Sequence, residues 1–376
     1  MTTTELITDE ARFATMGDEW NELLAASASD VPFLTWEWLY TWWKHLREDR
    51  TLHIVTVRDG ERLIAIAPLA LRPPRLGRLQ PHRVLEFLGS GLVGSDYLDL
   101  IVRRGADRAA LTALAAHFGD AGVVAELTRV RPQSSCASVM SGQLDEAGWT
   151  VVEEQTETCP YLDLAGHDWE SYLQTLGSSH RYNVRRRVRN LEKSFTVEFE
   201  ECTEPRRVAC LDALVQLHHL RREQLGGSDA LHTDELVAFH RELTEHALKC
   251  GWLRLYVMNL DGNPAASVYG FLYGGVYYFY QSGFDPGYNK FSVGLVVLAY
   301  SIRRAIEEGV AEYDLLHGNE SYKYRWTSTQ RPLVRLALYP PDRTGRWSLK
   351  LAGLKATLKS LRGSRDEAED GSCRAA

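Results

Sequence analysis

The sequence predicts a mixed α/β protein in which one plan of strands and helices occurs twice. Its 376 residues are too many for one ordinary core and suit two domains. The stretches LHIVTVRDGERLIAIAPLAL and LRLYVMNLDGNPAASVYGFL each predict a strand, an Asp-Gly turn and a return strand. Further strands and a helix follow each hairpin. We therefore expect two mixed sheets, each flanked by helices.

In the first half, two helices precede the hairpin. Residues 10–27 have the spacing of an amphipathic helix, and Thr35 is suited to cap an aromatic helix that follows. The four tryptophans of that second helix favour burial in a core over a sugar-stacking surface. The other elements expected here are strands at 52–58, 63–71, 84–88, 97–102, 123–130, 150–154 and 160–164, and helices at 107–118 and 136–147.

The second half repeats the plan after a helical insertion. The expected elements are helices at 169–176, 179–193, 206–225, 233–250 and 292–308, and strands at 196–200, 252–259, 265–273, 276–284, 312–316 and 333–339. We therefore divide the chain into an N-terminal domain at 1–165 and a C-terminal domain at 166–345. Residues 346–376 are expected to form a helix and a polar, disordered tail.

Composition and charge exclude several classes of protein. The net charge of −7 gives no overall basic field that would attract nucleic acid. No stretch approaches the roughly 20 apolar residues of a membrane span, and the first residues lack the pattern of a secretion signal. The six cysteines form no CxxC pair and no Cys/His cluster, so we expect neither a metal site nor a disulfide framework. A cytoplasmic protein is expected.

The second copy of the plan brings polar residues to one edge of its sheet. The strand at 276–284, the helix at 292–308 and the strand at 312–316 form a crossover, which is right-handed when the strands are parallel neighbours. Such units bind ligands at the carboxyl ends of their strands and the amino end of their helix. We therefore expect the functional site at residues 282–294 and 317–320.

The start of the helix near residue 292 has features of an anion site. Free backbone N–H groups at a helix start favour an anion, and Lys290 adds positive charge. Ser292 is suited to cap the helix, and Gly294 lets a pyrophosphate approach the backbone. The alternative is an ordinary capped helix, because the segment is neither a P-loop nor a GxGxxG motif.

The segment after the strand at 312–316 holds the candidate catalytic groups. Lys323 could stabilise an oxyanion, His317 or Glu320 could accept a proton, and Tyr322 could position a substrate. The alternative is that these side chains are ordinary turn and surface residues.

Two further groups are candidates for substrate binding. Arg181, Arg185 and Arg189 recur every four residues on a predicted helix and form a stripe suited to phosphates. A solvated helix face is the alternative, and RNA is disfavoured because no nucleic-acid motif accompanies the stripe. Asp96 follows a glycine-rich loop and either faces a cleft between the halves or occupies a turn.

The chain lacks the usual motifs for covalent catalysis. It contains no GxSxG, no HExxH and no cysteine with a convincing histidine partner. Direct attack of an acceptor on a bound ester or thioester needs only positioning, an oxyanion donor and a proton acceptor. The residues therefore favour direct transfer.

Six motifs occur along the chain, namely PFLTWEWLYTWW, APLAL, FLGSGLVGSDYLDL, HRYNVRRRVRNLEK, YQSGFDPGYNKFSVG and YDLLHGNESYKYRW. Together they resemble the GNAT-like (Gcn5-related) acetyltransferases of the CelD/BcsL type, after cellulose biosynthesis, and more remotely the FemAB/FemX peptidoglycan transferases. They follow the family order over roughly residues 30–340, and this order is more specific than any one motif.

The resemblance implies two tandem GNAT-like domains with the working site in the second or at their junction. It implies that acetyl-CoA or another acyl-CoA is bound at Asn289, Lys290, Ser292, Val293 and Gly294. The usual pyrophosphate signature, Q/R-x-x-G-x-G/A, is only partly matched there, so acyl-CoA is an expectation from the resemblance.

The resemblance also assigns roles around the acceptor. Lys323 corresponds to a lysine that assists transfer in FemX-like relatives, and Asp96 would face the acceptor. The residues expected to bind substrate are Asp96, Tyr97, Arg181, Arg185, Tyr280 and Asp314.

We favour transfer of an acyl group from acyl-CoA to an amine or hydroxyl of a small molecule, amino sugar or saccharide precursor. The first alternative is an aminoacyl-tRNA-dependent transferase. The second is a non-catalytic partner of an exopolysaccharide synthase. The acceptor, the acyl chain length and the oligomeric state stay open at this point.

Overall fold

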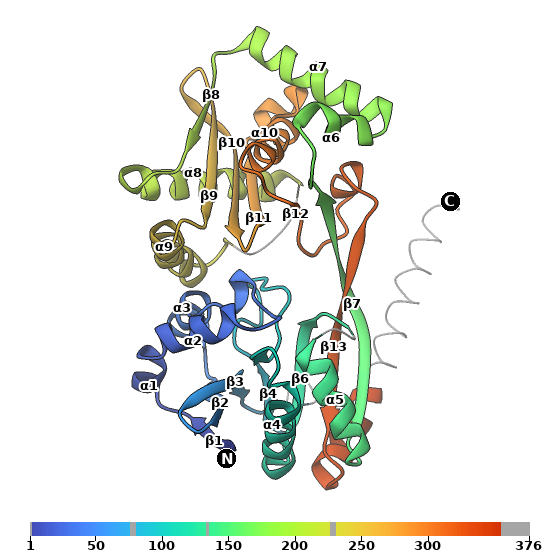
Figure 1. Cartoon of the computed structure of the whole chain (residues 1–376). Helices are drawn as coiled ribbons and strands as arrows, with labels where there is room; N and C mark the ends of the chain where they lie inside the picture. Colours follow the sequence, from blue (N-terminus) through green and yellow to red (C-terminus); the bar gives the residue numbers. More distant parts are fainter. Residues whose placement is uncertain (1, 76–79, 133–134, 226–230, 355–376) are drawn as a thin grey trace, which may run out of the picture.

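The computed structural model describes residues 2–75, 80–132, 135–225 and 231–354. Its centre is a mixed sheet in the order β1-β2-β3-β4-β6-β13-β7-β12-β11-β10-β9-β8, with β5 paired to β3. Helices flank the sheet, and its two ends belong to the two halves of the chain (Figure 1). The predicted mixed α/β class is confirmed.

The first half alternates strands and helices. Its elements are β1 (Thr2–Ile7), α1 (Glu10–Ala14), α2 (Gly17–Ala25), η1 (Pro32–Leu34), α3 (Trp36–Leu46), β2 (Thr51–Asp59), β3 (Arg62–Arg72), β4 (Val84–Phe87), β5 (Ile101–Val102), α4 (Asp107–Ala121), β6 (Val124–Val130), α5 (Cys136–Glu146) and β7 (Thr150–Asp163).

The second half begins with helices and returns to strands. Its elements are α6 (Trp169–Thr175), α7 (Ser178–Ser194), β8 (Val197–Glu201), η3 (Glu204–Arg206), α8 (Arg207–Leu225), α9 (Asp234–Lys249), β9 (Leu253–Leu260), β10 (Asn263–Tyr273), β11 (Val276–Phe284), η4 (Pro286–Phe291), α10 (Val293–Glu307), β12 (Glu312–Asp314), η5 (Lys323–Arg325) and β13 (Gln330–Tyr339).

Both halves contain the predicted plan. The hairpins are β2–β3 and β9–β10, each closed by an Asp-Gly turn. Each hairpin leads to a further strand, then a helix, then a strand parallel to it: β4, α4 and β6 in the first half, and β11, α10 and β12 in the second. The duplication predicted from the two hairpins is present in the fold.

Two long strands join the halves. β13 comes last among the strands but lies in the sheet of the first half, between β6 and β7. β7 pairs with β13 up to Pro160 and then with β12 from Tyr161 to Asp163. In Figure 1, β7 and β13 run side by side from one half toward the other. The predicted domain boundary between residues 165 and 166 stays a prediction. Strand β13 follows that boundary in the sequence but completes the sheet formed by residues before it.

Aromatic packing also joins the halves. Trp38 on α3 is buried, and its ring meets Phe239, Phe271 and Tyr280 of the second half edge to face, with centroids 5.3–5.6 Å apart. One hydrophobic core therefore spans both halves, while a second core lies under α10. Thr35 caps α3 as predicted, because its side chain accepts a hydrogen bond from the Trp38 N–H. The preference for burial of this aromatic helix is confirmed.

Some predicted elements differ in the structure. Residues 10–27 form two helices because the Thr15 N–H turns back to the Arg12 carbonyl and closes α1. The strand expected at 97–102 is reduced to Ile101–Val102, since Tyr97 has a positive φ of 60° that a strand does not accept. Strand β1 was not predicted. The expected disordered tail lies outside the described residues.

Gly283 on β11 tests how tightly the sheet packs on α8. A Cβ there would lie 2.4 Å from the His218 backbone nitrogen, so α8 would have to move. We expect Gly283→Ala to lower the free energy of unfolding by about 3 kcal/mol, measured by urea denaturation. Gly119→Ala is the matched control, because a Cβ on α4 at that position meets nothing within 4 Å. It should raise stability by about 0.5–1 kcal/mol, and equal effects of the two changes would contradict this packing.

Candidate functional site

The site begins where two parallel strands separate. β11 pairs with β12 only through Val276–Tyr278. Beyond Asp314 the chain leaves β11, and the Leu315 N–H donates to the Pro160 carbonyl of β7 at 2.9 Å. The rest of β11 therefore has an open edge on this side. A register shift against β10 leaves Tyr280 outside the ladder, and such bulges are frequent beside active sites.

Two cavities follow this open edge. The junction cavity is lined by both halves, and its residues include Leu92, Val93, Gly94, His218, His317 and Glu320. The helix cavity lies beside the start of α10, and its residues include His180, Asn183, Arg187, Ser292, Gly294 and Arg325. Four residues line both cavities, namely Arg221, Phe279, Ser282 and Tyr322. The two cavities therefore meet at β11.

A buried carboxylate orients the histidine of the junction cavity. Asp96 is fully buried and accepts a hydrogen bond from Arg129 of β6 at 2.9 Å. The backbone N–H and the ring Nδ1 of His317 each lie 2.9 Å from its other oxygen. Burial alone would raise the pKa of Asp96, but the charges and hydrogen bonds of His317 and Arg129 hold it below its ordinary value. Because Nδ1 is used, Nε2 is the nitrogen of His317 that can exchange a proton in the cavity.

Tyr97 and Asp314 form a second buried pair behind the cavity. The Tyr97 hydroxyl donates to Asp314 at 2.6 Å, and the guanidinium of Arg331 lies 3.8 Å from the same carboxylate. Burial raises the pKa of Asp314 to about 6, although Arg331 acts in the opposite direction. Asp96, Tyr97 and Asp314, all predicted to bind substrate, line neither cavity. Asp96 contacts His317 directly, whereas Asp314 accepts a hydrogen bond from the backbone N–H of Leu316 at 2.8 Å.

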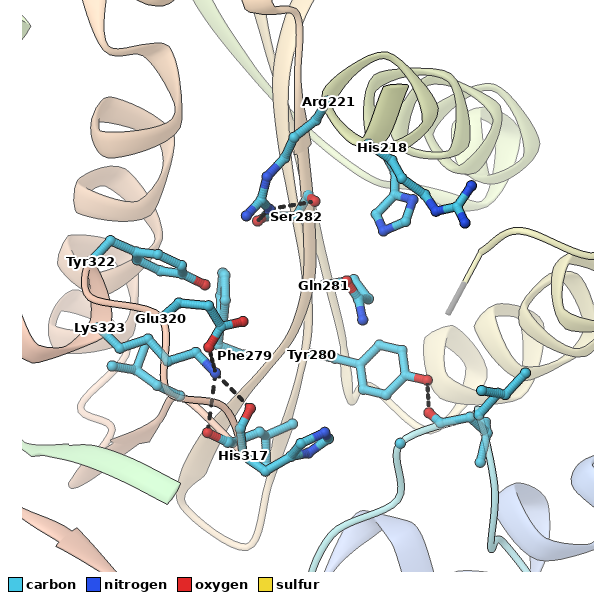
Figure 2. A pocket seen from close by; sticks show the side chains of 16 residues that line it. His218, Arg221, Phe279, Tyr280, Gln281, Ser282, His317, Glu320, Tyr322 and Lys323 are labelled. Atoms are coloured by element: carbon cyan, nitrogen blue, oxygen red, sulfur yellow. Dashed lines mark hydrogen bonds and ion pairs between the residues drawn. The ribbon is translucent and has the colours of Figure 1, made fainter. Parts of the chain in front are cut away.

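Lys323 is bound into a turn. It is 3% exposed, and its Nζ lies 2.6 Å from the His317 carbonyl, 3.3 Å from the Leu316 carbonyl and 3.1 Å from the Glu320 carboxylate. Figure 2 shows this cluster beside the cavity. Gly318 permits the turn, since a Cβ there would lie 2.2 Å from the Glu320 carboxylate. Lys323 lines the cavity, but its ammonium group is occupied by these three contacts. Its role in the structure is therefore to hold His317 and Glu320 in place.

Two tyrosines define the cavity walls. Tyr322 lines both cavities, and burial raises its pKa well above the ordinary value, so its hydroxyl stays protonated and can donate. The Tyr280 hydroxyl donates to the Val93 carbonyl of the first half. Tyr280 therefore holds the glycine-rich loop of the first half against the junction cavity.

The helix cavity brings together most of the predicted donor residues. Asn289, Ser292, Val293 and Gly294 line it, whereas the side chain of Lys290 lies over the Phe291 ring, outside the lining. Ser292 occupies the cap position but makes no capping hydrogen bond with its side chain, so the expected cap is absent. A Cβ on Gly294 would lie 3.1 Å from the Phe284 ring, and this glycine therefore also lets α10 pack against β11.

The arginines of α7 divide between two faces. Arg181 and Arg185 line a groove between α6 and α7, away from both cavities, and Arg185 pairs with Glu170. Arg187, which was not predicted, lines the helix cavity and donates to the Lys290 carbonyl at 2.6 Å. Arg325 from the segment after β12 lines the same cavity.

The sequence predicted α8 as a helix at 206–225 but assigned no site residue to it. His218 and Arg221 of this helix line the junction cavity, and Figure 2 shows both pointing toward β11. Their separation of three residues places them on one helix face, which was the available signal. Nothing in the sequence alone indicated that this face meets the site.

The second half of the chain resembles a known family. The family model described as an acetyltransferase (GNAT) domain matches residues 178–324. Residues 178–324 form a GNAT-type acetyltransferase domain. This supports the prediction that the chain is an acyltransferase enzyme. The GNAT domain holds His317, Glu320, Tyr322, Lys323 and the start of α10.

Solved structures share the fold over nearly the whole chain. The structure of FemX has 11% identity and a TM-score of 0.63, with 90% of this chain and 97% of that chain covered. The C-terminal domain of a putative lysylphosphatidylglycerol synthetase from Agrobacterium fabrum has 11% identity and a TM-score of 0.54, with coverage of 92% and 96%. A protein of unknown function from Bacteroides thetaiotaomicron has 12% identity and a TM-score of 0.53, with coverage of 90% and 99%. No curated protein sequence matches the chain.

The described residues offer neither a metal cluster nor a membrane-spanning helix. Across residues 2–354, the gaps in the description excepted, no three His, Cys, Asp or Glu side chains come together in a way that could hold a metal ion. In the same part of the chain, every helix is too short or too polar to span a bilayer.

Asp96 supplies a prediction about stability and pH. We expect Asp96→Asn to lower the free energy of unfolding by about 3–5 kcal/mol at neutral pH, because Arg129 loses its buried partner. The pKa of Asp96 is lowered by folding, so its contribution is complete above the pKa of the unfolded side chain and is lost as the pH falls through the folded value. The deficit of the variant should therefore shrink on acidification in urea titrations.

Asp314→Asn is the control with the opposite sign. Folding raises the pKa of Asp314 to about 6, so the native protein loses stability as the pH rises from the ordinary range of aspartate to that value. The deficit of this variant should shrink as the pH rises. The same pH trend in both variants would contradict the assigned charge states.

Proposed function

We propose that the chain transfers an acyl group from acyl-CoA to an amine or hydroxyl by direct attack. The observation that carries this proposal is the meeting of the two cavities at β11, where Phe279, Ser282 and Tyr322 line both. A donor in the helix cavity and an acceptor in the junction cavity would then have their reacting groups side by side.

The helix cavity suits the phosphates of the donor. The first backbone N–H groups of α10 carry the positive end of the helix dipole. Arg187 and Arg325 add full positive charges from two other segments. Together they favour an anionic donor such as acetyl-CoA.

The junction cavity suits proton transfer from the acceptor. As the acceptor nitrogen or oxygen forms its bond to the acyl carbon, the carbon–sulfur bond of the thioester breaks and the thiolate leaves. His317 takes the acceptor proton at Nε2, and the buried Asp96 stabilises the imidazolium that forms. Tyr322 stays protonated and is suited to donate a hydrogen bond to the reacting carbonyl or the leaving sulfur. Lys323 acts as a positioning residue.

The resemblance to CelD/BcsL-type proteins extends the proposal to a biological setting. We propose a cytoplasmic enzyme that acts on a saccharide precursor in polysaccharide biosynthesis. A donor of the aminoacyl-tRNA class is the second candidate, because Arg181, Arg185 and Trp169 combine basic and aromatic side chains in the groove between α6 and α7.

Arg187 provides a test of the donor. We expect acetyl-CoA to bind in calorimetry, and Arg187→Gln to weaken its affinity about tenfold or more, since a charge-assisted bond is lost. Arg186→Gln is the control, because Arg186 is exposed on α7 and lines neither cavity. If acetyl-CoA fails to bind while bulk tRNA binds with a steep salt dependence, the aminoacyl-tRNA donor replaces acyl-CoA.

His317 provides a test of the chemistry. We expect His317→Gln to lower kcat by about 10²- to 10⁴-fold with little change in the KM for acetyl-CoA, because the proton acceptor is removed and the helix cavity is intact. Glu320→Gln should have the smaller effect, since Glu320 is already paired with Lys323. A larger loss in Glu320→Gln would transfer the role of proton acceptor to Glu320.

A further inference from the structure

We infer that the acceptor carries an anionic group, a carboxylate or a phosphate, and that Arg221 binds this group while the attacking amine or hydroxyl lies beside His317. The inference rests on the proposed acyl transfer and names the chemical class of its acceptor. Figure 2 shows Arg221 and His317 at opposite ends of the junction cavity, so an acceptor that reaches both would span it.

The guanidinium of Arg221 has weak protein partners. Its Nη1 lies 3.3 Å from the Ser282 hydroxyl and 3.5 Å from the Ser282 carbonyl, and the group stacks 5.5 Å from the centre of the Phe284 ring. A guanidinium has five N–H donors, so these long contacts leave most of them for a ligand. Among the described residues, no carboxylate lies within ion-pair distance of Arg221.

Several other buried or half-buried arginines of the chain have carboxylate partners. Arg72 pairs with Glu86 at 2.8 Å, and Arg331 pairs with Glu312 at 2.6 Å. The cost of removing such a charge from water is offset by a partner of opposite sign. Arg221 is half-buried on a cavity wall and has no carboxylate partner among the described residues. This arrangement is expected of a side chain that binds an anion from solution.

The charge of the junction cavity supports the same class of ligand. Glu320 is the acidic residue of its lining, and it is paired with Lys323 at 3.1 Å. Among the basic residues of the lining, Arg221 carries a full positive charge on the cavity wall. Such a charge raises the local concentration of anionic ligands.

The proposed donor site has its own cationic side chains, and these lie in the helix cavity. Arg187 and Arg325 lie beside the start of α10 in the helix cavity. Arg221 comes from α8 and lies where the two cavities meet. It can therefore contact an acceptor in the junction cavity while the phosphates of the donor occupy the start of α10.

Binding of matched ligand pairs to the full chain tests the inference without turnover. Calorimetry would compare glucosamine 6-phosphate with glucosamine for the phosphate arm, and serine with ethanolamine for the carboxylate arm. We expect the anionic member of at least one pair to bind about 10- to 100-fold more tightly. Arg221→Gln should abolish that preference, and Arg221→Lys should restore part of it, because lysine keeps the charge but not the planar fork.

Arg303→Gln is the matched control, since Arg303 is exposed on α10, pairs with Glu307 and lines neither cavity. It should keep the full preference. Equal affinity within both pairs, or a preference that survives Arg221→Gln, overturns the inference. A loss of acetyl-CoA affinity in Arg221→Gln with an intact anion preference also overturns it, because Arg221 then serves the donor.

The same samples separate this inference from the proposed function. Acetyl transfer to neutral amines without any preference for anionic ones leaves the acyltransferase proposal in place and removes the anionic acceptor. An anion preference that depends on Arg221, in a protein that does not bind acetyl-CoA, keeps the acceptor class and removes the acyl-CoA donor.

Discussion

The buried charge of Asp96 constrains three parts of the molecule at once. A carboxylate without water is tolerated only if hydrogen-bond donors surround it, and here they come from β6 and from the segment after β12. The loop that carries Asp96 belongs to the first half, whereas His317 belongs to the second. The hydrogen bonds between Asp96 and His317 therefore fix the two halves against each other and also fix the orientation of the His317 ring. Stability and the geometry of the site depend on one interaction.

The sheet explains why the site lies between the halves. β7 and β13 fill the centre of the sheet, so the chain after β12 finds its partner in β7 and leaves the outer part of β11 open. Beyond the last residue paired with β12, the edge of β11 borders a space that side chains from other segments line. Here α8, the turn at Gly318 and the loop at Val93 supply that lining. The cavity is a consequence of strand order as much as of the residues around it.

The sequence predicted local structure better than long-range pairing. The Asp-Gly turns located both hairpins, and Thr35 located the start of α3, because these signals act over a few residues. The single strand β7 was predicted as two, since its continuity depends on β13, whose residues lie 170 to 189 positions further along the chain than their partners (Pro160↔Gln330 to Thr150↔Tyr339). Period and composition contain no information on such a partner.

The candidate site was predicted in the same uneven way. The segment His317–Lys323 and the start of α10 were identified, because polar residues that follow a buried strand are an unusual local pattern. The pairing of His317 with Asp96 joins residues 221 positions apart, and no pattern within one segment predicts it. Arg221 was missed because a helix with many charged residues gives no indication of which one meets a cavity.

The segment that joins a strand to the following helix has a different role in each of the two copies. In the second half, the segment between β11 and α10 stays short and presents the helix start to the helix cavity. In the first half, the segment between β4 and α4 is longer and carries Val93, Gly94 and Asp96 across to the other half. Its helix α4 begins with Asp107, whose negative charge opposes binding of an anion at that helix start. Under the proposed function, the first copy thus contributes to the acceptor side of a site whose donor side belongs to the second copy.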